Sequence, residues 1–217
     1  MTVSIASPAT AKEQADPPKA HTIDVSTPAP EPAVQRSYHM HDGLYLRLSV
    51  GVGSLWSTFD DGVASNNIDG NGFTYALDAL VGGSPSRGVA IGGALLTTSS
   101  IGIEFSRPGQ PIARRNINLA VLGAFIDGFP NPADGWHLGG ALGFARINVA
   151  DNAVNGLTST NGLAGAGWLG YDWWVGDEWS VGFLFRLLGG VTGGSEGTYN
   201  VSASALSATV MFAGLYN

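Results

Sequence analysis

Apolar and polar residues alternate in eight stretches of the chain after residue 41. The clearest stretch is 44–54, where leucine or valine occupies every second position and Arg47 and Ser49 lie between them. Because successive side chains of a β-strand point to opposite faces, each stretch predicts a strand with one apolar face. The eight predicted strands are 44–54, 73–82, 88–97, 116–126, 136–146, 163–175, 179–191 and 203–216.

The gaps between these strands predict how they connect. They alternate in length, and the long ones are Leu55–Gly72, Thr98–Arg115, Ile147–Gly162 and Thr192–Ser202. All the prolines after residue 41 fall in gaps, as the hydrogen-bond ladder of a sheet requires. Long loops on one side and short turns on the other are typical of membrane barrels. We therefore predict an all-β fold, an eight-stranded antiparallel up-and-down transmembrane β-barrel over residues 42–217.

The first 41 residues have a different composition from the rest. They hold six of the eleven prolines and no glycine, which predicts a disordered, Pro-rich N-terminal segment at 1–41. Ala9-Thr10-Ala11 is a small-x-small pattern like a signal-peptidase site. The segment to about residue 11 is either the remnant of a truncated signal peptide or a chance match.

The alternation also predicts which side chains meet lipid. Six apolar residues are expected to point outward: Leu46, Leu48, Leu77, Val121, Phe183 and Phe212. In the fourth strand Asn116 and Asn118 are expected to point inward. Arg146 breaks the alternation, so we expect the fifth strand to end or bulge there. Aromatic residues should form two girdles. One comprises Tyr45, Phe125, Phe129, Trp136, Tyr171, Trp173, Trp174, Trp179 and Tyr216, and the other Trp56, Phe73, Tyr75, Phe105 and Phe144.

Composition and charge exclude several functions. Charged residues are 12% of the chain, against about 25% in soluble domains. The net charge is −7 and no basic stripe is present, so nucleic-acid binding is not expected. Cysteine is absent, which removes disulfides and Cys-based metal or catalytic sites. Gly197–Asn217 lacks charge, but its serines, threonines and asparagines disfavour a membrane helix.

A set of polar residues is expected inside the barrel: Arg47, Asp78, His137, Asp172 and Arg186. We predict that Arg47 pairs with Asp78 and that Arg186 pairs with Asp172, because neighbouring strands then carry opposite charges. This polar cluster either fills a narrow interior or forms a gated ion path or ligand site. No recognisable nucleophile accompanies His137, so a hydrogen-bonded filler role is favoured over catalysis.

Two other segments contain metal-ligand residue types. The group His39, His41 and Asp42 is either a metal site or a solvated strand entry. The oxygen-rich segment 60–71 suggests calcium, but it lacks the EF-hand spacing and its closing Glu. We favour solvated segments in both cases, and we predict no catalytic, cofactor-binding or metal-binding residues. We therefore expect no cofactor and no enzyme activity.

Three segments resemble the small eight-stranded outer-membrane barrels of the OmpA transmembrane-domain and OmpX type. They are HDGLYLRLSVGVG (41–53), GLAGAGWLGYDWWVGDEWSVGFLFRLLGG (162–190) and ATVMFAGLYN (208–217). The last looks like the C-terminal signal read by barrel-assembly machinery, although Asn217 rather than an aromatic residue ends it. The resemblance implies a bacterial outer-membrane location, with outer-membrane lipids and that machinery as partners.

The favoured function is a structural or surface-interaction role with long extracellular loops and no large pore. Its surface partner is unknown. Bulky inward residues, Trp168 and Trp174 among them, are expected to plug the lumen. One alternative is a narrow pore or small-ligand carrier that uses the polar cluster. Another is a soluble lipocalin-like barrel that binds an apolar ligand, which needs an apolar interior and a polar exterior.

Overall fold

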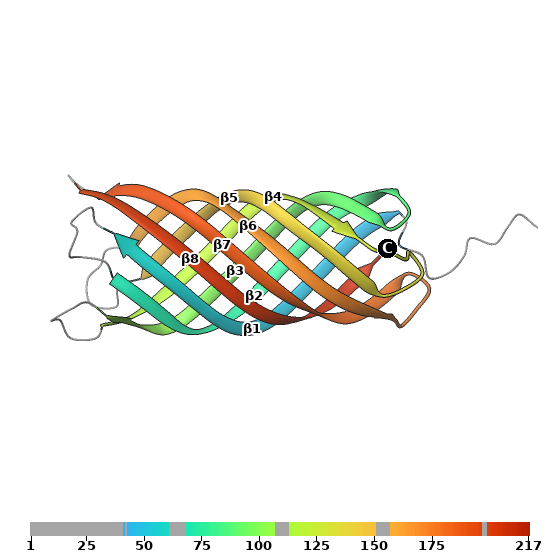
Figure 1. The fold of residues 1–217 in the computed structure, drawn as a ribbon, viewed down its shortest axis with the longest axis horizontal. Coiled ribbons are helices and arrows are strands. Elements are labelled where there is room, and N and C mark those ends of the chain that lie inside the picture. Colours follow the sequence, from blue (N-terminus) through green and yellow to red (C-terminus); the bar gives the residue numbers. More distant parts are fainter. Residues whose placement is uncertain (1–40, 42, 61–67, 107–112, 151–156, 197–198) are drawn as a thin grey trace, which may run out of the picture. The chain divides into compact units, whose positions relative to one another are not determined.

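The protein is an eight-stranded closed barrel. The computed structural model describes residues 41, 43–60, 68–106, 113–150, 157–196 and 199–217, all of which belong to the unit Ser37–Asn217. The strands are β1 (Leu44–Asp60), β2 (Ile68–Ser86), β3 (Val89–Ser106), β4 (Ala113–Gly128), β5 (Trp136–Ala150), β6 (Leu157–Trp174), β7 (Trp179–Glu196) and β8 (Tyr199–Tyr216). Each is antiparallel to its neighbours, and β8 closes on β1 (Figure 1). The predicted fold class is confirmed.

The strands are longer than the alternation predicted. β1 continues to Asp60 and β2 begins at Ile68, so most of the predicted loop Leu55–Gly72 is paired strand. The other three predicted long gaps are shortened in the same way, and their remaining residues, like 61–67, lie outside the described residues. The prediction of long loops was wrong in this respect. Lipid imposes the alternation only where the wall crosses the membrane, whereas the backbone ladder continues beyond it.

The connections on the other side are tight turns. Only Arg87 and Gly88 connect β2 to β3, and Gly88 has a positive φ of 75°. A Cβ at Gly88 would lie 2.6 Å from the Phe129 carbonyl oxygen, so both the space and the backbone require glycine. The C-terminal end of β8 lies at this same short-turn end of the barrel, where the amide of Asn217 donates to the Glu178 carbonyl at 3.0 Å (Figure 1).

The pairing register makes the strands slope around the barrel axis. Following directly paired residues around the barrel from Leu44 returns to β1 at Ser54. Such stagger is what tilts the strands of a closed barrel. It also decides which side chains from distant strands share a level inside the lumen.

The outer wall carries the apolar belt expected of a membrane barrel. Leu48, Leu77, Phe183 and Phe212 are exposed on it and Leu46 is half-buried on the same outward face, as predicted. Outward aromatic rings gather at the short-turn end: Trp136, Tyr171, Trp173, Trp179 and Tyr216. Further outward rings lie toward the other end of the belt: Trp56, Phe73, Tyr75 and Phe144. The predicted soluble lipocalin-like alternative is inconsistent with this exterior.

The predicted orientation of the fourth strand was wrong. Val121 is only 2% exposed and points inward, whereas Leu122 is 66% exposed on the outside. Asn116 and Asn118 lie on the outward face instead. A period of two separates the faces of a strand but does not say which face is outside.

Two further expectations also failed. Four predicted girdle residues are buried inside the barrel: Tyr45, Phe105, Phe125 and Phe129. β5 shows no bulge at Arg146, which continues the strand and projects outward. None of the described residues belongs to a helix that is long and apolar enough to cross a membrane. Most of the segment 1–41, including the small-x-small pattern at Ala9-Thr10-Ala11, lies outside the described residues.

Candidate functional site

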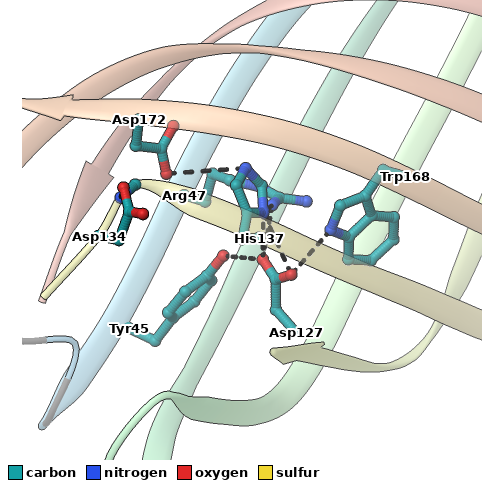
Figure 2. Close-up of polar contacts among 8 residues, drawn as sticks. Tyr45, Arg47, Asp127, Asp134, His137, Trp168 and Asp172 are labelled. Atoms are coloured by element: carbon teal, nitrogen blue, oxygen red, sulfur yellow. Dashed lines mark hydrogen bonds and ion pairs between the residues drawn. The ribbon is translucent and has the colours of Figure 1, made fainter. Parts of the chain in front are cut away.

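Asp127 is the centre of a buried polar cluster at the short-turn end of the barrel (Figure 2). Its carboxylate accepts hydrogen bonds from the Tyr45 hydroxyl at 2.6 Å, from Arg47 Nη1 at 2.7 Å and from Trp168 Nε1 at 3.1 Å. His137 Nδ1 lies 3.2 Å from both carboxylate oxygens. Four strands, β1, β4, β5 and β6, therefore meet at one side chain.

Sequence reasoning missed Asp127. The residue lies one position beyond the predicted end of the fourth strand, and the inverted orientation of that strand would have turned it outward. The available signal was an acid directly before the turn that begins at Gly128, at the level where Arg47 and His137 were expected inside. A buried arginine requires a partner, and Asp127 was a candidate at that level.

All five predicted interior residues are buried in the lumen, but the predicted ion pairs were wrong. Arg47 pairs with Asp127 at 2.7 Å rather than with Asp78. Its guanidinium carbon also lies 4.6 Å from the centroid of the Trp168 ring. An arginine enclosed in this way keeps its charge because a carboxylate and an aromatic face replace the water it loses.

Asp78 instead pairs with Arg186 in a second polar group, further along the lumen. Arg186 Nη2 donates to Thr98 Oγ1 at 2.7 Å, and the Thr97 backbone amide lies 3.3 Å from Asp78 Oδ1. This pair joins β7 to β2, which are not neighbours in the sheet. The predicted pairing of adjacent strands failed because a long side chain in a narrow barrel reaches across the interior.

Asp172, in the cluster around Asp127, is the member whose carboxylate has the fewest hydrogen bonds. Its Oδ2 lies 3.7 Å from His137 Nε2, and neither carboxylate oxygen has a hydrogen-bond partner among the described residues. His137 therefore stands between two carboxylates, Asp127 on one ring nitrogen and Asp172 on the other (Figure 2). The cluster contains two carboxylates and one guanidinium, and the imidazole lies between the two carboxylates.

His41 closes the short-turn end beneath this cluster. Its ring stacks on Phe129 with centroids 3.5 Å apart and lies 4.7 Å from the Trp174 ring. Burial lowers the pKa of His41 to about 4, because the charged imidazolium would lose its water. His39 and Asp42, the other members of the predicted metal group, lie outside the described residues. Within the described part of the chain, no three His, Asp or Glu side chains are arranged so that they could hold a metal ion.

The geometry of the cluster around Asp127 is suited to holding strands together rigidly and closing the lumen at the short-turn end. Each ring nitrogen of His137 faces a carboxylate, and no serine or threonine hydroxyl bonds to that ring among the described residues. A histidine that activates a serine or threonine nucleophile would need such a contact. The arrangement instead cross-links four strands through hydrogen bonds that are shielded from water, which strengthens them.

The closed antiparallel barrel, its apolar outer belt and its two groups of outward aromatic rings define a small outer-membrane β-barrel. No protein-family model matches the chain, and no curated protein matches it in sequence.

Solved structures similar to this chain include an outer membrane protein, a surface protein and an attachment invasion locus protein. OprG from Pseudomonas aeruginosa is 10% identical, with 83% of this chain and 99% of that chain covered and a TM-score of 0.49. The Neisserial surface protein NspA is 16% identical, with coverage of 78% and 96% and a TM-score of 0.41. The attachment invasion locus protein Ail of Yersinia pestis is 13% identical, with coverage of 78% and 99% and a TM-score of 0.34.

Proposed function

We propose that this barrel is a structural or surface-interaction protein of the bacterial outer membrane, neither a large pore nor an enzyme. The observation that supports the proposal is a lumen filled by side chains. Eight strands leave an interior just wide enough for side chains. Arg47 and Arg186 are among the largest fully buried side chains of the barrel, and each is held across the lumen by a carboxylate.

A second, apolar layer fills the lumen toward the ends of the strands opposite the short turns. It is made of large side chains that are almost fully buried: Leu55, Ile103, Ile117, Leu119, Ile147 and Leu188. Buried hydroxyls lie among these side chains, but Thr74 already bonds to the Ser99 carbonyl and Thr160 to Thr192. An ion crossing this layer would therefore lose its hydration and gain few free polar partners. Two different layers therefore close the same lumen, which argues against steady conductance.

The rim of the barrel beyond the apolar belt is the surface that we assign to partners. Polar outward side chains of this rim form contacts with one another. Thr58 donates to Asp69 at 2.8 Å, and the exposed Arg114 pairs with Glu104 at 2.7 Å. This rim faces the cell exterior in our proposal, whereas the short turns and the N-terminal segment lie in the periplasm. Outer-membrane lipids and the barrel-assembly machinery are the remaining partners.

Planar-bilayer recording tests the closed lumen. The wild-type protein is expected to show no steady conductance. The double variant Arg47→Ser with Asp127→Ser removes the charged pair of the lower layer together, and it should also stay closed because the apolar layer persists. Folding of each sample is checked by its gel mobility with and without heating. Steady porin-like conductance of the wild type would overturn the proposal in favour of a narrow pore.

Single cysteines test the orientation, because the native chain has none. Asp69→Cys places a thiol on the exposed rim, and Asp177→Cys places one on the exposed turn between β6 and β7. A membrane-impermeant maleimide added to intact cells is expected to label the first variant and to label the second only after lysis. Protease should likewise cleave within 55–72 and spare 82–88. Labelling in the reverse order would reject the proposed orientation.

A further inference from the structure

The outer wall over β3, β4, β5 and β6 changes from apolar to polar within a few rows of paired residues. One row consists of four large apolar side chains at directly paired positions: Leu95, Leu122, Phe144 and Leu163. They point outward, and Leu122, Phe144 and Leu163 are between 61% and 78% exposed. This row belongs to the lipid-facing belt.

Two rows further from the short turns, the same four strands present only amides and hydroxyls. The paired outward residues there are Ser99, Asn118, Asn148 and Ser159. Asn118 Nδ2 donates to Ser99 Oγ at 2.6 Å, so part of the row is held in place. Outward amides and hydroxyls at the edge of an apolar belt lie where lipid headgroups begin.

Arg146 lies in the intermediate row, between Ala120 and Asn161. Its Nε donates to Asn148 Oδ1 at 3.1 Å and its Nη2 to Ser159 Oγ at 3.2 Å. These bonds orient an exposed guanidinium that has five N–H donors in total. Arg146 forms no ion pair with a carboxylate of the described residues.

A groove of about 610 Å³ follows the apolar row and the intermediate row, with Leu95, Leu122, Phe144 and Leu163 at its apolar end and Arg146 and Asn161 at its polar end, next to the row of amides and hydroxyls. The small side chain of Ala120 lies between the two ends. The opposite side of the barrel offers no equivalent, because no described lysine or arginine lies on the outward face of β7, β8, β1 or β2.

We propose that this groove binds one acylated, phosphorylated sugar lipid of the leaflet at the rim end of the barrel. An acyl chain occupies the apolar end, and the phosphate accepts hydrogen bonds from Arg146, a group whose planar fork suits phosphate. The hydroxyls of the sugar face the row of asparagine and serine side chains. The assignment of the leaflet rests on the orientation proposed above, whereas the groove and its chemistry do not.

Native mass spectrometry of the full chain in a neutral detergent tests the proposal. The probes are lipid A, the same lipid without its phosphates, and inorganic phosphate. Wild-type protein is expected to bind lipid A at least about tenfold more tightly than the phosphate-free lipid, the ratio that roughly one charge-assisted hydrogen bond supplies. Inorganic phosphate at the same concentration should not displace lipid A, because it lacks the acyl chain.

Variants separate the groove from general adhesion of lipid. Arg146→Gln should lower lipid A affinity about tenfold and leave the phosphate-free lipid unchanged, and Arg146→Lys should fall between them. Arg114→Gln, which removes another exposed arginine outside the groove, should bind as the wild type does. Ala120→Trp should obstruct the groove, whereas Ala124→Trp, at an outward position on the same strand outside the groove, should not.

The controls make each outcome decisive. Heat-modified gel mobility establishes that every variant is folded before binding is compared, and Arg146→Lys supplies a conservative variant if Arg146→Gln does not fold. Equal binding of lipid A by the wild type and Arg146→Gln would overturn the proposal. So would equal binding of the phosphorylated and phosphate-free lipids by the wild type. Because binding in detergent does not depend on orientation, cysteine labelling in the reverse order would change the leaflet and not the site.

Discussion

The two halves of the barrel interior are closed by opposite chemistry. Near the short turns, Arg47, Asp127 and His137 form a network of charged and hydrogen-bonded groups. Toward the other end, Leu119 and Ile147 face each other in a directly paired position within an apolar layer. The same narrow lumen is thus filled first by charged groups and then by packed apolar side chains with buried hydroxyls, such as Ser100 and Thr160, among them.

The exterior explains this difference. Where lipid covers the wall, the outward side chains are apolar, and the charged Arg47 and Asp127 point inward beside apolar residues such as Phe125. Beyond the belt the outside meets water, and the alternation reverses as in a soluble barrel. β4 contains both regimes, because Leu122 and Ile126 point to lipid at one end while Ile117 and Leu119 point inward at the other. The comparison shows that one strand can pass from lipid into water while its side chains continue to alternate between the inner and outer faces.

The largest expected effect comes from breaking the polar half. Asp127→Ala leaves the guanidinium of Arg47 buried without its carboxylate, so we expect a loss of about 3–5 kcal/mol in the free energy of unfolding. Urea titration of the protein folded in lipid vesicles measures it. Glu104→Gln, which breaks an exposed ion pair, should change the value by about 1 kcal/mol or less. Similar losses for the two variants would show that the network does not stabilise the barrel.

The apolar half should respond through cavity formation. Leu119→Ala removes a fully buried side chain between β3 and β5 and should cost about 2–4 kcal/mol. Leu122→Ala on the same strand faces lipid, which fills the vacated space, so its loss should be clearly smaller. The same urea titration compares them, and an equal loss would place Leu119 outside the packed interior.

Arginine substitutions along the outer face of β4 locate the point where this face passes from lipid to water. Leu122→Arg exposes a charge to lipid and should cost about 2–4 kcal/mol if it lies near the bilayer midplane. Asn118→Arg lies four residues along β4 toward the rim, on the same outward face, and should cost about 1 kcal/mol or less. Unfolding from vesicles of one defined thickness gives both values. A larger cost at Asn118 would move the apolar belt toward the rim.

The smallest effect concerns the short-turn end and depends on pH. The pKa of His41 is lowered from 6.5 to about 4, so the unfolded chain binds more protons between these values. Stability should therefore fall with decreasing pH in this window, by about 1 kcal/mol between pH 7 and pH 5.5 from His41 alone. His41→Phe keeps a ring against Phe129 and removes the titration. Subtracting its stability-against-pH profile from that of the wild type isolates the contribution of His41 to the free energy of unfolding. Identical profiles would contradict this prediction.

The sequence by itself determined the number of strands, their order and most of their lipid-facing residues. The reason is local, because a strand between lipid and a filled lumen must alternate with period two, as at Leu48, Leu77 and Phe183. It also placed Arg47, His137 and Asp172 on the inward face. Strand ends beyond the belt were not predicted, since there neither lipid nor an apolar exterior marks the pattern.

Only the tertiary structure decided which inward residues meet. The stagger of the closed barrel brings Arg47 to Asp127 and Arg186 to Asp78, although the paired residues are 80 and 108 positions apart in the chain. It likewise decided that Val121 points inward, because the side of a strand that faces lipid is set by how the whole sheet closes. Which charged side chains pair across the lumen depends on the combined register of every strand around it. No local sequence pattern contains this information.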